Sequence, residues 1–373
     1  MTVPLSILDL SPISSGSDAG QALRNTIDLA RRAESFGYHR YWVAEHHFAE
    51  GVASAAPAVL IGQILAATDR IRVGAGAVQV GHQTPLSIVE SFGLLDALYP
   101  GRVDLGLGRS GQRRTEAVAA FSRPKPPPRE AHEVDGLLIP APFDFSKLLV
   151  TPRFEVYAKL LQQPAAVAPD FAEVVDDIGA LIDGTYEGAR ATPGEGAKVE
   201  LWILGSSAGQ SAEVAGRLGL PFGANYHVAP ASVLEAVEAY RAAFRPSRVL
   251  DRPYVIVSAD VVVGPDAATA RRLAAGYGLW VRSIRTGQGA IRFPSPAEAA
   301  AASWSAEDDA LVRDRLDTQF VGDPAAVAER LRTLQRVTGA DELLVTTITH
   351  DHGDRVRSFA LLAEEWGSLP NGS

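Results

Sequence analysis

Short hydrophobic runs alternate along the chain with longer amphipathic stretches. Apolar, β-branched or aromatic runs predict eight strands, at residues 5–10, 39–44, 71–80, 102–107, 199–204, 222–226, 254–263 and 342–348. Helical spacing of apolar residues predicts helices at 21–36, 55–68, 85–98, 154–182, 207–218, 232–244, 267–285, 324–337 and 355–366. Strands that alternate with helices pair in parallel, and eight such units fit a closed ring. We therefore expect a (β/α)8 TIM barrel.

Residues that start and stop helices agree with these periods. Thr84 and Pro85 stand where the N-cap and first position of the third helix are expected. Gly37 and Gly219 each follow a helical pattern, as glycines beyond a helix C-terminus do.

Two segments exceed what a minimal barrel needs, although the whole chain, 1–373, is expected to be one domain. Residues 111–151 contain the proline run RPKPPPRE, which blocks helix locally. Residues 283–304 are rich in Gly, Pro and Ser, and are expected to form a mobile excursion that acts as a lid.

Composition narrows the possible partners. Of 373 residues, 46% are hydrophobic, enough for a large core, and no stretch approaches the length of a membrane span. The net charge of −9, without a basic stripe, argues against nucleic acid. Zero cysteines exclude disulfides and thiolate chemistry, which is consistent with a reducing cytoplasm. The N-terminus has no basic segment or long apolar run, so no signal peptide is expected.

The second predicted strand ends in Glu45-His46-His47, where titratable groups meet the edge that carries chemistry in parallel α/β folds. Because neighbours on a strand point to opposite faces, only one of the two imidazoles is expected to face the pocket. Glu45 is placed to orient an imidazole and tune its pKa. A structural histidine is the alternative.

Glycines and hydroxyls close three further strands. Gly76 and Ala77, in RVGAGAVQ, leave a smooth floor suited to a flat ring, or else mark close packing. Arg109 and Ser110, in GLGRSG, combine an arginine fork with glycine-rich backbone, as phosphate cradles do. Ser206 and Ser207 precede a helix whose N-terminus favours an anion, although simple N-capping is the alternative. With Arg109 these serines predict a phosphate site.

The remaining strand ends carry polar residues that are expected mainly in the pocket wall and its loops. These residues are Asp9, Ser11, Asn225, Tyr226, His227, His350 and His352. The last two suggest a metal site, but no matching set of carboxylates and histidines follows from the spacing, so none is expected.

Together these segments resemble a known family. YWVAEHHF, and then RVGAGAVQVGHQTPLSIVESFGLLDALYPGRVDLGLGRSG, are similar to the bacterial luciferase-like, flavin-dependent monooxygenases. The similarity resumes in GLPFGANYH, FVGDPAAVAERL and DELLVTTITHDHGDRVRSFALLAEEW, and covers roughly two-thirds of the chain. Residues 111–151 depart from luciferase itself, which leaves the substrate unassigned.

The resemblance implies a TIM barrel that binds reduced FMN at its C-terminal mouth. His46 matches the histidine that acts as base or stabilises the flavin–oxygen adduct. Gly76-Ala77 matches a non-prolyl cis peptide, Arg109 matches the arginine on the flavin phosphate, and Ser206 and Ser207 match the phosphate-binding helix terminus.

The leading hypothesis is an FMN-dependent monooxygenase that reacts O2 at flavin C4a to give a peroxide and oxidises a small organic substrate. A separate NAD(P)H-dependent reductase would supply the reduced flavin. Hydride transfer with a deazaflavin coenzyme, a non-catalytic flavin-binding subunit and a metal-dependent hydrolase are the alternatives. Family resemblance also implies a homodimer, with the helices after strands two and three at its interface.

Overall fold

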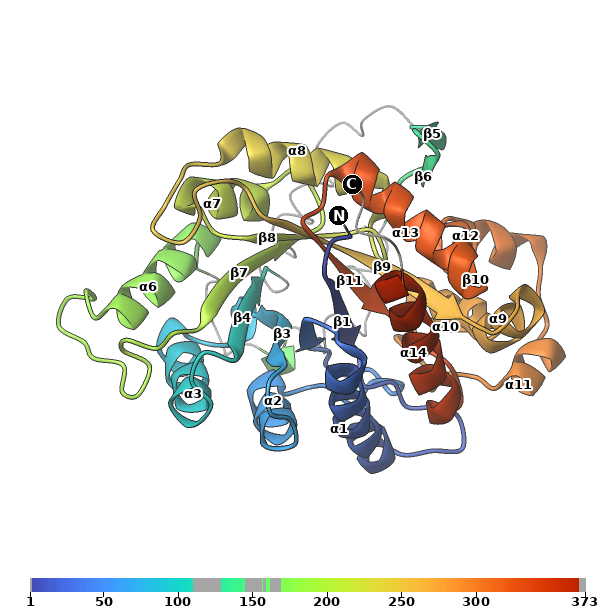
Figure 1. The fold of residues 1–373 in the computed structure, drawn as a ribbon, viewed down its shortest axis with the longest axis horizontal. Coiled ribbons are helices and arrows are strands. Elements are labelled where there is room, and N and C mark those ends of the chain that lie inside the picture. Colours follow the sequence, from blue (N-terminus) through green and yellow to red (C-terminus); the bar gives the residue numbers. More distant parts are fainter. Residues whose placement is uncertain (1, 110–128, 145–155, 157–158, 162–168, 369–373) are drawn as a thin grey trace.

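Within the described residues, eight parallel strands close into a barrel (Figure 1). The computed structural model describes all residues except 1, 110–128, 145–155, 157–158, 162–168 and 369–373. The barrel strands are β1 (Leu5–Asp9), β2 (Arg40–Val43), β3 (Arg72–Gln79), β4 (Val103–Gly108), β7 (Glu200–Gly205), β8 (Phe222–Asn225), β9 (Val255–Val263) and β11 (Glu342–Thr346). They pair in that order, β8 pairs with β9, and β11 returns to β1. The predicted TIM barrel is confirmed.

Helices surround the strands and cover their outer faces, which is why β1, β2 and β9 are buried along their whole length. The helices are α1 (Ala19–Phe36), α2 (Pro57–Ala66), α3 (Pro85–Leu98), α6 (Phe171–Asp183), α7 (Gln210–Leu218), α8 (Val233–Ala243), α9 (Ala267–Ala274), α10 (Tyr277–Arg285), α11 (Pro296–Ala301), α12 (Ala306–Thr318), α13 (Pro324–Thr338) and α14 (His352–Ser368). Figure 1 shows α9 to α12 together on one side of the barrel.

Helix ends follow the expected local chemistry. The Thr84 side chain accepts from the Ser87 backbone at the start of α3, with Pro85 in the first turn. Gly37 and Gly219 end α1 and α7 in the left-handed conformation, with φ of 85° and 61°. These three predictions are confirmed.

The helix expected over 267–285 is two helices, α9 and α10. The break falls at Gly276, where a side chain is excluded: an added Cβ would lie 2.6 Å from the carbonyl oxygen of Pro294 and 3.0 Å from the Phe293 ring. Only glycine fits at this point, where the segment at Phe293 and Pro294 packs against the break.

Of the helix expected over 154–182, residues 156 and 159–161 are helical, and α6 begins at Phe171 after the N-cap Asp170. In the first insertion, β5 (His132–Val134) and β6 (Leu137–Ile139) form an antiparallel hairpin about Asp135-Gly136. The short strand β10 (Phe320–Gly322) pairs with the extended end of β9. The sequence did not predict β5, β6 or β10, and the proline run lies outside the described residues.

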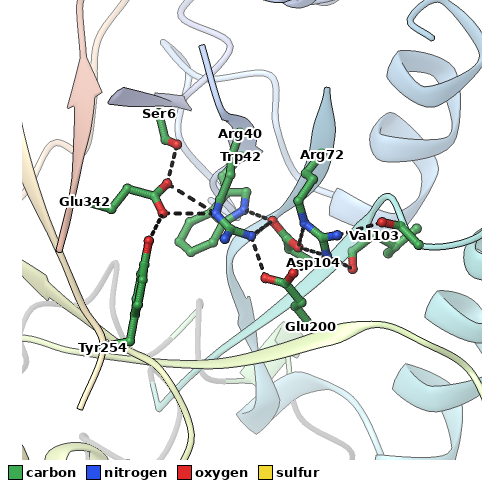
Figure 2. Close-up of polar contacts among 10 residues, drawn as sticks. Ser6, Arg40, Trp42, Arg72, Val103, Asp104, Glu200, Tyr254 and Glu342 are labelled. Atoms are coloured by element: carbon green, nitrogen blue, oxygen red, sulfur yellow. Dashed lines mark hydrogen bonds and ion pairs between the residues drawn. The ribbon is translucent and has the colours of Figure 1, made fainter. Parts of the chain in front are cut away.

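Charged side chains close the N-terminal end of the barrel, away from the strand ends that the sequence marks for chemistry (Figure 2). Arg40 reaches Asp104 at 2.9 Å, Glu200 at 2.6 Å and Glu342 at 3.2 Å. Arg72 and the Trp42 indole also donate to Asp104. Buried charges need partners, and here each carboxylate has one. This layer therefore fixes the floor of the barrel and leaves the opposite mouth for function.

Candidate active site

A cavity of about 1020 Å³ opens at the C-terminal ends of the strands. Every barrel strand, or the loop that follows it, contributes to the wall; examples are Leu10, His46, Gly76, Arg109, Ser206, His227, Asp260 and Ile348. The expected clustering of polar strand ends is therefore present for most of the predicted residues. This volume lies at the upper end of ligand sites, as suits a cofactor together with a small substrate.

The ends of β4 and β7 place Arg109, Ser206 and Ser207 in the cavity wall. Helix α7 starts later than the sequence suggested, at Gln210, and its N-cap is Gly209 with no side-chain hydrogen bond. Neither serine therefore caps the helix, so the N-capping alternative is wrong. Hydroxyls, a guanidinium and an uncapped helix N-terminus meet here, which is the donor set that binds a phosphate.

Asp170 contributes an opposing negative charge to this part of the wall. Its two oxygens accept from the Gln210 side chain at 2.6 Å and from the backbone of Ala172 at 2.8 Å. These hydrogen bonds, the one from Gln210 first, lower the pKa of Asp170. Arg109 lies over the Phe171 ring, 6.0 Å from its centroid. The remaining predicted phosphate ligand, Ser110, lies outside the described residues.

The cavity lining includes the Gly76-Ala77 peptide of β3, and this peptide is cis, as the resemblance implies. The pairing of β3 with β4 shifts register between Ala75 and Val78, across the same peptide. An added Cβ on Gly76 would lie 3.0 Å from the Leu8 side chain and 3.1 Å from Trp42. Glycine here thus allows close packing inside the barrel, while the peptide also faces the cavity.

Both imidazoles after β2 line the cavity, so the expectation that only His46 or His47 would do so is wrong. Strand β2 ends at Val43, and alternation of side chains no longer applies three residues later. Glu45 hydrogen-bonds His47, with 2.8 Å between Oε1 and Nε2, and accepts from the Gln79 backbone at 2.9 Å. Glu45 therefore orients His47 and ties the loop to β3.

Burial at the base of the cavity lowers the pKa of His46 to about 4, and the nearby His47 lowers it further. The surface that the side chain exposes lines the cavity, so it faces the enclosed cavity space in place of bulk water. His46 is therefore a neutral imidazole at physiological pH, able to accept a proton. Burial raises the pKa of Glu45, against the hydrogen bonds from His47 and Gln79.

The wall formed by β8 and β9 is more polar than the sequence suggested. His227 Nδ1 lies 2.6 Å from Ser258 Oγ, and burial, then Arg315 and His46, lower the His227 pKa to about 3. Asp260 accepts from Arg315 at 3.1 Å and from the Tyr277 hydroxyl. We predicted His227 in the wall but missed the others. Ser258 and Asp260, two apart in the apolar strand IVSADVVV, were the available signal.

Several other polar strand ends have structural roles. Asp9 is fully buried, and accepts from Arg355 at 2.6 Å and from the Ser11 backbone at 2.7 Å. His350 contacts Ser15, and His352 contacts Asp28 at 2.8 Å. Among the described residues, no group of three or more His, Cys, Asp or Glu side chains is arranged to hold a metal ion.

The excursion at 283–304 is attached to the barrel mouth by backbone hydrogen bonds. Gly51 donates to Ala290 at 2.8 Å, Phe293 donates to Ile13 at 2.8 Å, and Ser15 donates to Phe293 at 2.9 Å. Gly287, Gly289 and Ala290 line the cavity. In this structure the excursion is a bonded part of the wall, in contrast to the expected free lid.

In the described part of the chain, no helix is long and apolar enough to cross a membrane.

Comparison with known proteins agrees with this geometry. Residues 3–134 and 154–342 match the sequence model of the luciferase-like monooxygenases. The chain is 38% identical to the protein YvbT of Bacillus subtilis, covering 97% of this chain and 96% of that one. It is 36% identical to a luciferase-like monooxygenase of Escherichia coli K12, covering 96% of each. The crystal structure of apo-MsnO8 matches at 31% identity with a TM-score of 0.78, covering 99% of both chains. The chain belongs to the luciferase-like monooxygenase family.

Proposed function

We propose that this protein is an FMN-dependent monooxygenase that oxidises a small organic substrate with O2. The observation that carries the proposal is the convergence of Arg109, Ser206, Ser207 and the uncapped start of α7 at one end of the cavity. The cis peptide at Gly76-Ala77 lies on the neighbouring strand, β3. Membership of a monooxygenase family supports the reaction class.

The residues at this end suit a flavin phosphate. The Ser206 and Ser207 hydroxyls make no hydrogen bond within the described residues, and α7 lacks a side-chain cap, so donors are available. Arg109 adds the charge that a phosphate dianion needs, and the acid beside it, Asp170, is already engaged by Gln210. In this proposal the backbone at Gly76 and Ala77 supports the flavin ring.

When bound, reduced FMN supplies the electrons that activate oxygen, and the reaction of oxygen at C4a stays a prediction. His46 holds or accepts a proton at its ring, which the low pKa keeps neutral. Glu45 acts through His47, which it orients, and keeps the loop against β3. The apolar wall from Leu8, Ile256 and Leu344 excludes water.

Cofactor titration tests the proposal. Quenching of tryptophan fluorescence is followed with FMN, riboflavin, FAD and a deazaflavin coenzyme, each oxidised and without substrate. We expect FMN to bind more tightly than riboflavin, because FMN has a phosphate that can contact Arg109 and riboflavin has none. Tighter binding of the deazaflavin than of FMN would overturn the proposal in favour of hydride transfer without oxygen. No saturable binding of any cofactor would overturn both enzyme hypotheses.

The proposal extends to the partners. No nicotinamide-binding fingerprint occurs in the sequence, so we propose that a separate NAD(P)H-dependent flavin reductase delivers reduced FMN.

We also propose a cytoplasmic homodimer. Val59 on α2, and Leu86, Leu94 and Leu98 on α3, are exposed, and such apolar surface on neighbouring helices suits a dimer interface.

A further inference from the structure

Besides Arg109, the described cavity lining holds two arginines: Arg285, whose guanidinium is engaged by Asp314 and the Leu311 carbonyl, and Arg315. Arg315, on α12, is 8% exposed and lines the cavity beside Asp260 and His227. In the ring of strands, β9 is four positions from β3, so Asp260 lies across the barrel from the Gly76-Ala77 peptide. A substrate held at this wall would face a flavin that rests on β3.

Two groups hold the Arg315 guanidinium in place, but some of its N–H donors make no hydrogen bond within the described residues. Its Nη2 donates to the Tyr277 hydroxyl at 2.6 Å and to Asp260 at 3.1 Å, and its guanidinium stacks on the Tyr277 ring at 5.6 Å. Within the described residues, Nε is buried without a hydrogen-bond partner, and Nη1 makes no hydrogen bond. A buried guanidinium with idle donors normally has a further acceptor.

The surroundings of Arg315 specify what that acceptor can be. Apolar side chains from β9, β11 and α10 (Ile256, Leu344, Trp280 and Val281) form the adjoining wall. His227 is held by Ser258, and the positive charge of Arg315 contributes to the low pKa of His227. Arg315 therefore keeps an electrostatic effect inside the cavity despite its pairing with Asp260. An apolar body with one anionic oxygen group matches both features.

We propose that Arg315 is a specificity-determining residue that binds a carboxylate on an otherwise apolar small-molecule substrate. Asp260 and Tyr277 are positioning residues that hold the guanidinium, and Asp260 also weakens carboxylate binding by competing for the same charge. That the bound molecule is a substrate rests on the proposed function. That Arg315 binds a carboxylate does not.

The test compares hexanoate with hexanamide, which differ in charge but little in size. Binding to the purified full chain is measured by NMR titration at pH 7, without cofactor. We expect the wild type to bind hexanoate roughly tenfold more tightly than hexanamide, the scale of one charge-assisted hydrogen bond. Arg315→Met should abolish the preference, whereas Asp260→Asn should increase it. Equal affinities in the wild type, or a preference that survives Arg315→Met, would overturn the proposal.

Controls separate this site from the phosphate site. Arg313→Met changes an exposed arginine on the same helix, paired with Asp309, and should leave the preference unchanged. Arg109→Ala should also leave it unchanged; loss of the preference there and not in Arg315→Met would place hexanoate at the phosphate site and refute the proposal. If Arg315→Met does not fold, the double change Arg315→Met with Asp260→Asn removes both charges and should lose the preference equally.

FMN affinity of the same variants distinguishes the two proposals. Arg315→Met should keep wild-type FMN affinity, because Arg315 is not at the phosphate end. Failure of the wild type to bind FMN would remove the proposed function while leaving a measured hexanoate preference intact.

Discussion

Glu45 hydrogen-bonds His47, with 2.8 Å between its Oε1 and the imidazole Nε2, whereas no carboxylate in the described part of the chain hydrogen-bonds the neighbouring His46. The two histidines are adjacent in sequence and share the cavity, yet their surroundings differ. Burial keeps His46 neutral, whereas His47 is fixed by a buried carboxylate that also accepts from β3. This difference suggests separate roles, with His46 in proton exchange and His47 in loop structure.

His46→Ala should lower turnover by roughly 10²–10⁴-fold, the usual contribution of a general acid or base, and leave FMN affinity nearly intact. His47→Ala should instead lower the free energy of unfolding by about 1–3 kcal/mol, since it removes a hydrogen bond from buried Glu45. Stopped-flow assays with reduced FMN, together with urea unfolding, measure both effects. Loss of turnover in His47→Ala with normal turnover in His46→Ala would reverse the assignment.

Stability should fall as pH is lowered from 6.5 towards 4. The pKa of His227 is lowered to about 3 and those of His46 and His82 to about 4, so in this window the unfolded chain binds more protons than the folded protein. One such group contributes at most about 1.4 kcal/mol per pH unit. Urea unfolding of His227→Gln should therefore show a shallower pH slope than the wild type. His132→Gln, at an exposed site on β5, should keep the wild-type slope.

Asp9→Asn should destabilise the fold by about 3–5 kcal/mol, because it leaves the buried Arg355 guanidinium without its charged partner. The matched control is Asp176→Asn, whose carboxylate is 49% exposed and pairs with Arg217. Exposed pairs contribute about 0–1 kcal/mol, so the control should change the unfolding free energy little. Similar losses in the two variants would show that the buried pair of Asp9 and Arg355 stabilises the fold no more than an exposed pair does.

Introducing charged side chains on α3 tests the proposed dimer interface. Leu94→Glu with Leu98→Glu places two carboxylates on the exposed face of α3, where the native side chains are 51% and 64% exposed. We expect sedimentation to show a monomer that still binds FMN. Val249→Glu, at an exposed position in the loop between α8 and β9, should remain dimeric. A wild type that sediments as a monomer at micromolar concentration would refute the homodimer.

The periodicity of apolar residues predicted the barrel because each strand is a distinct apolar run and each helix has an apolar face. What failed depended on contacts distant in sequence. The α9–α10 break falls at Gly276, against which Phe293 and Pro294 pack, and no local pattern reveals that contact. The turn at Asp135-Gly136 was a readable hairpin signal, obscured by the proline run before it.

The candidate site shows the same division. Arg109 and Ser206 follow their strands directly, and His46 lies three residues beyond β2, so topology alone brought them to one mouth. Arg315 comes from a helix outside the regular barrel units, and nothing in its local sequence links it to Asp260. The facing of His46 and His47 was misjudged because strand alternation was extended beyond Val43, where β2 ends.

The central claim, that Arg109 reads a flavin phosphate, is tested most directly by the affinities of Arg109→Ala for FMN and riboflavin. Removing a charge-assisted hydrogen bond should weaken FMN binding by roughly 1.5–3 kcal/mol. Riboflavin, which has no phosphate, should lose far less. Arg217→Ala, an exposed arginine on α7 paired with Asp176, should change neither affinity. The account predicts a loss confined to FMN, whereas equal losses for FMN and riboflavin would contradict it.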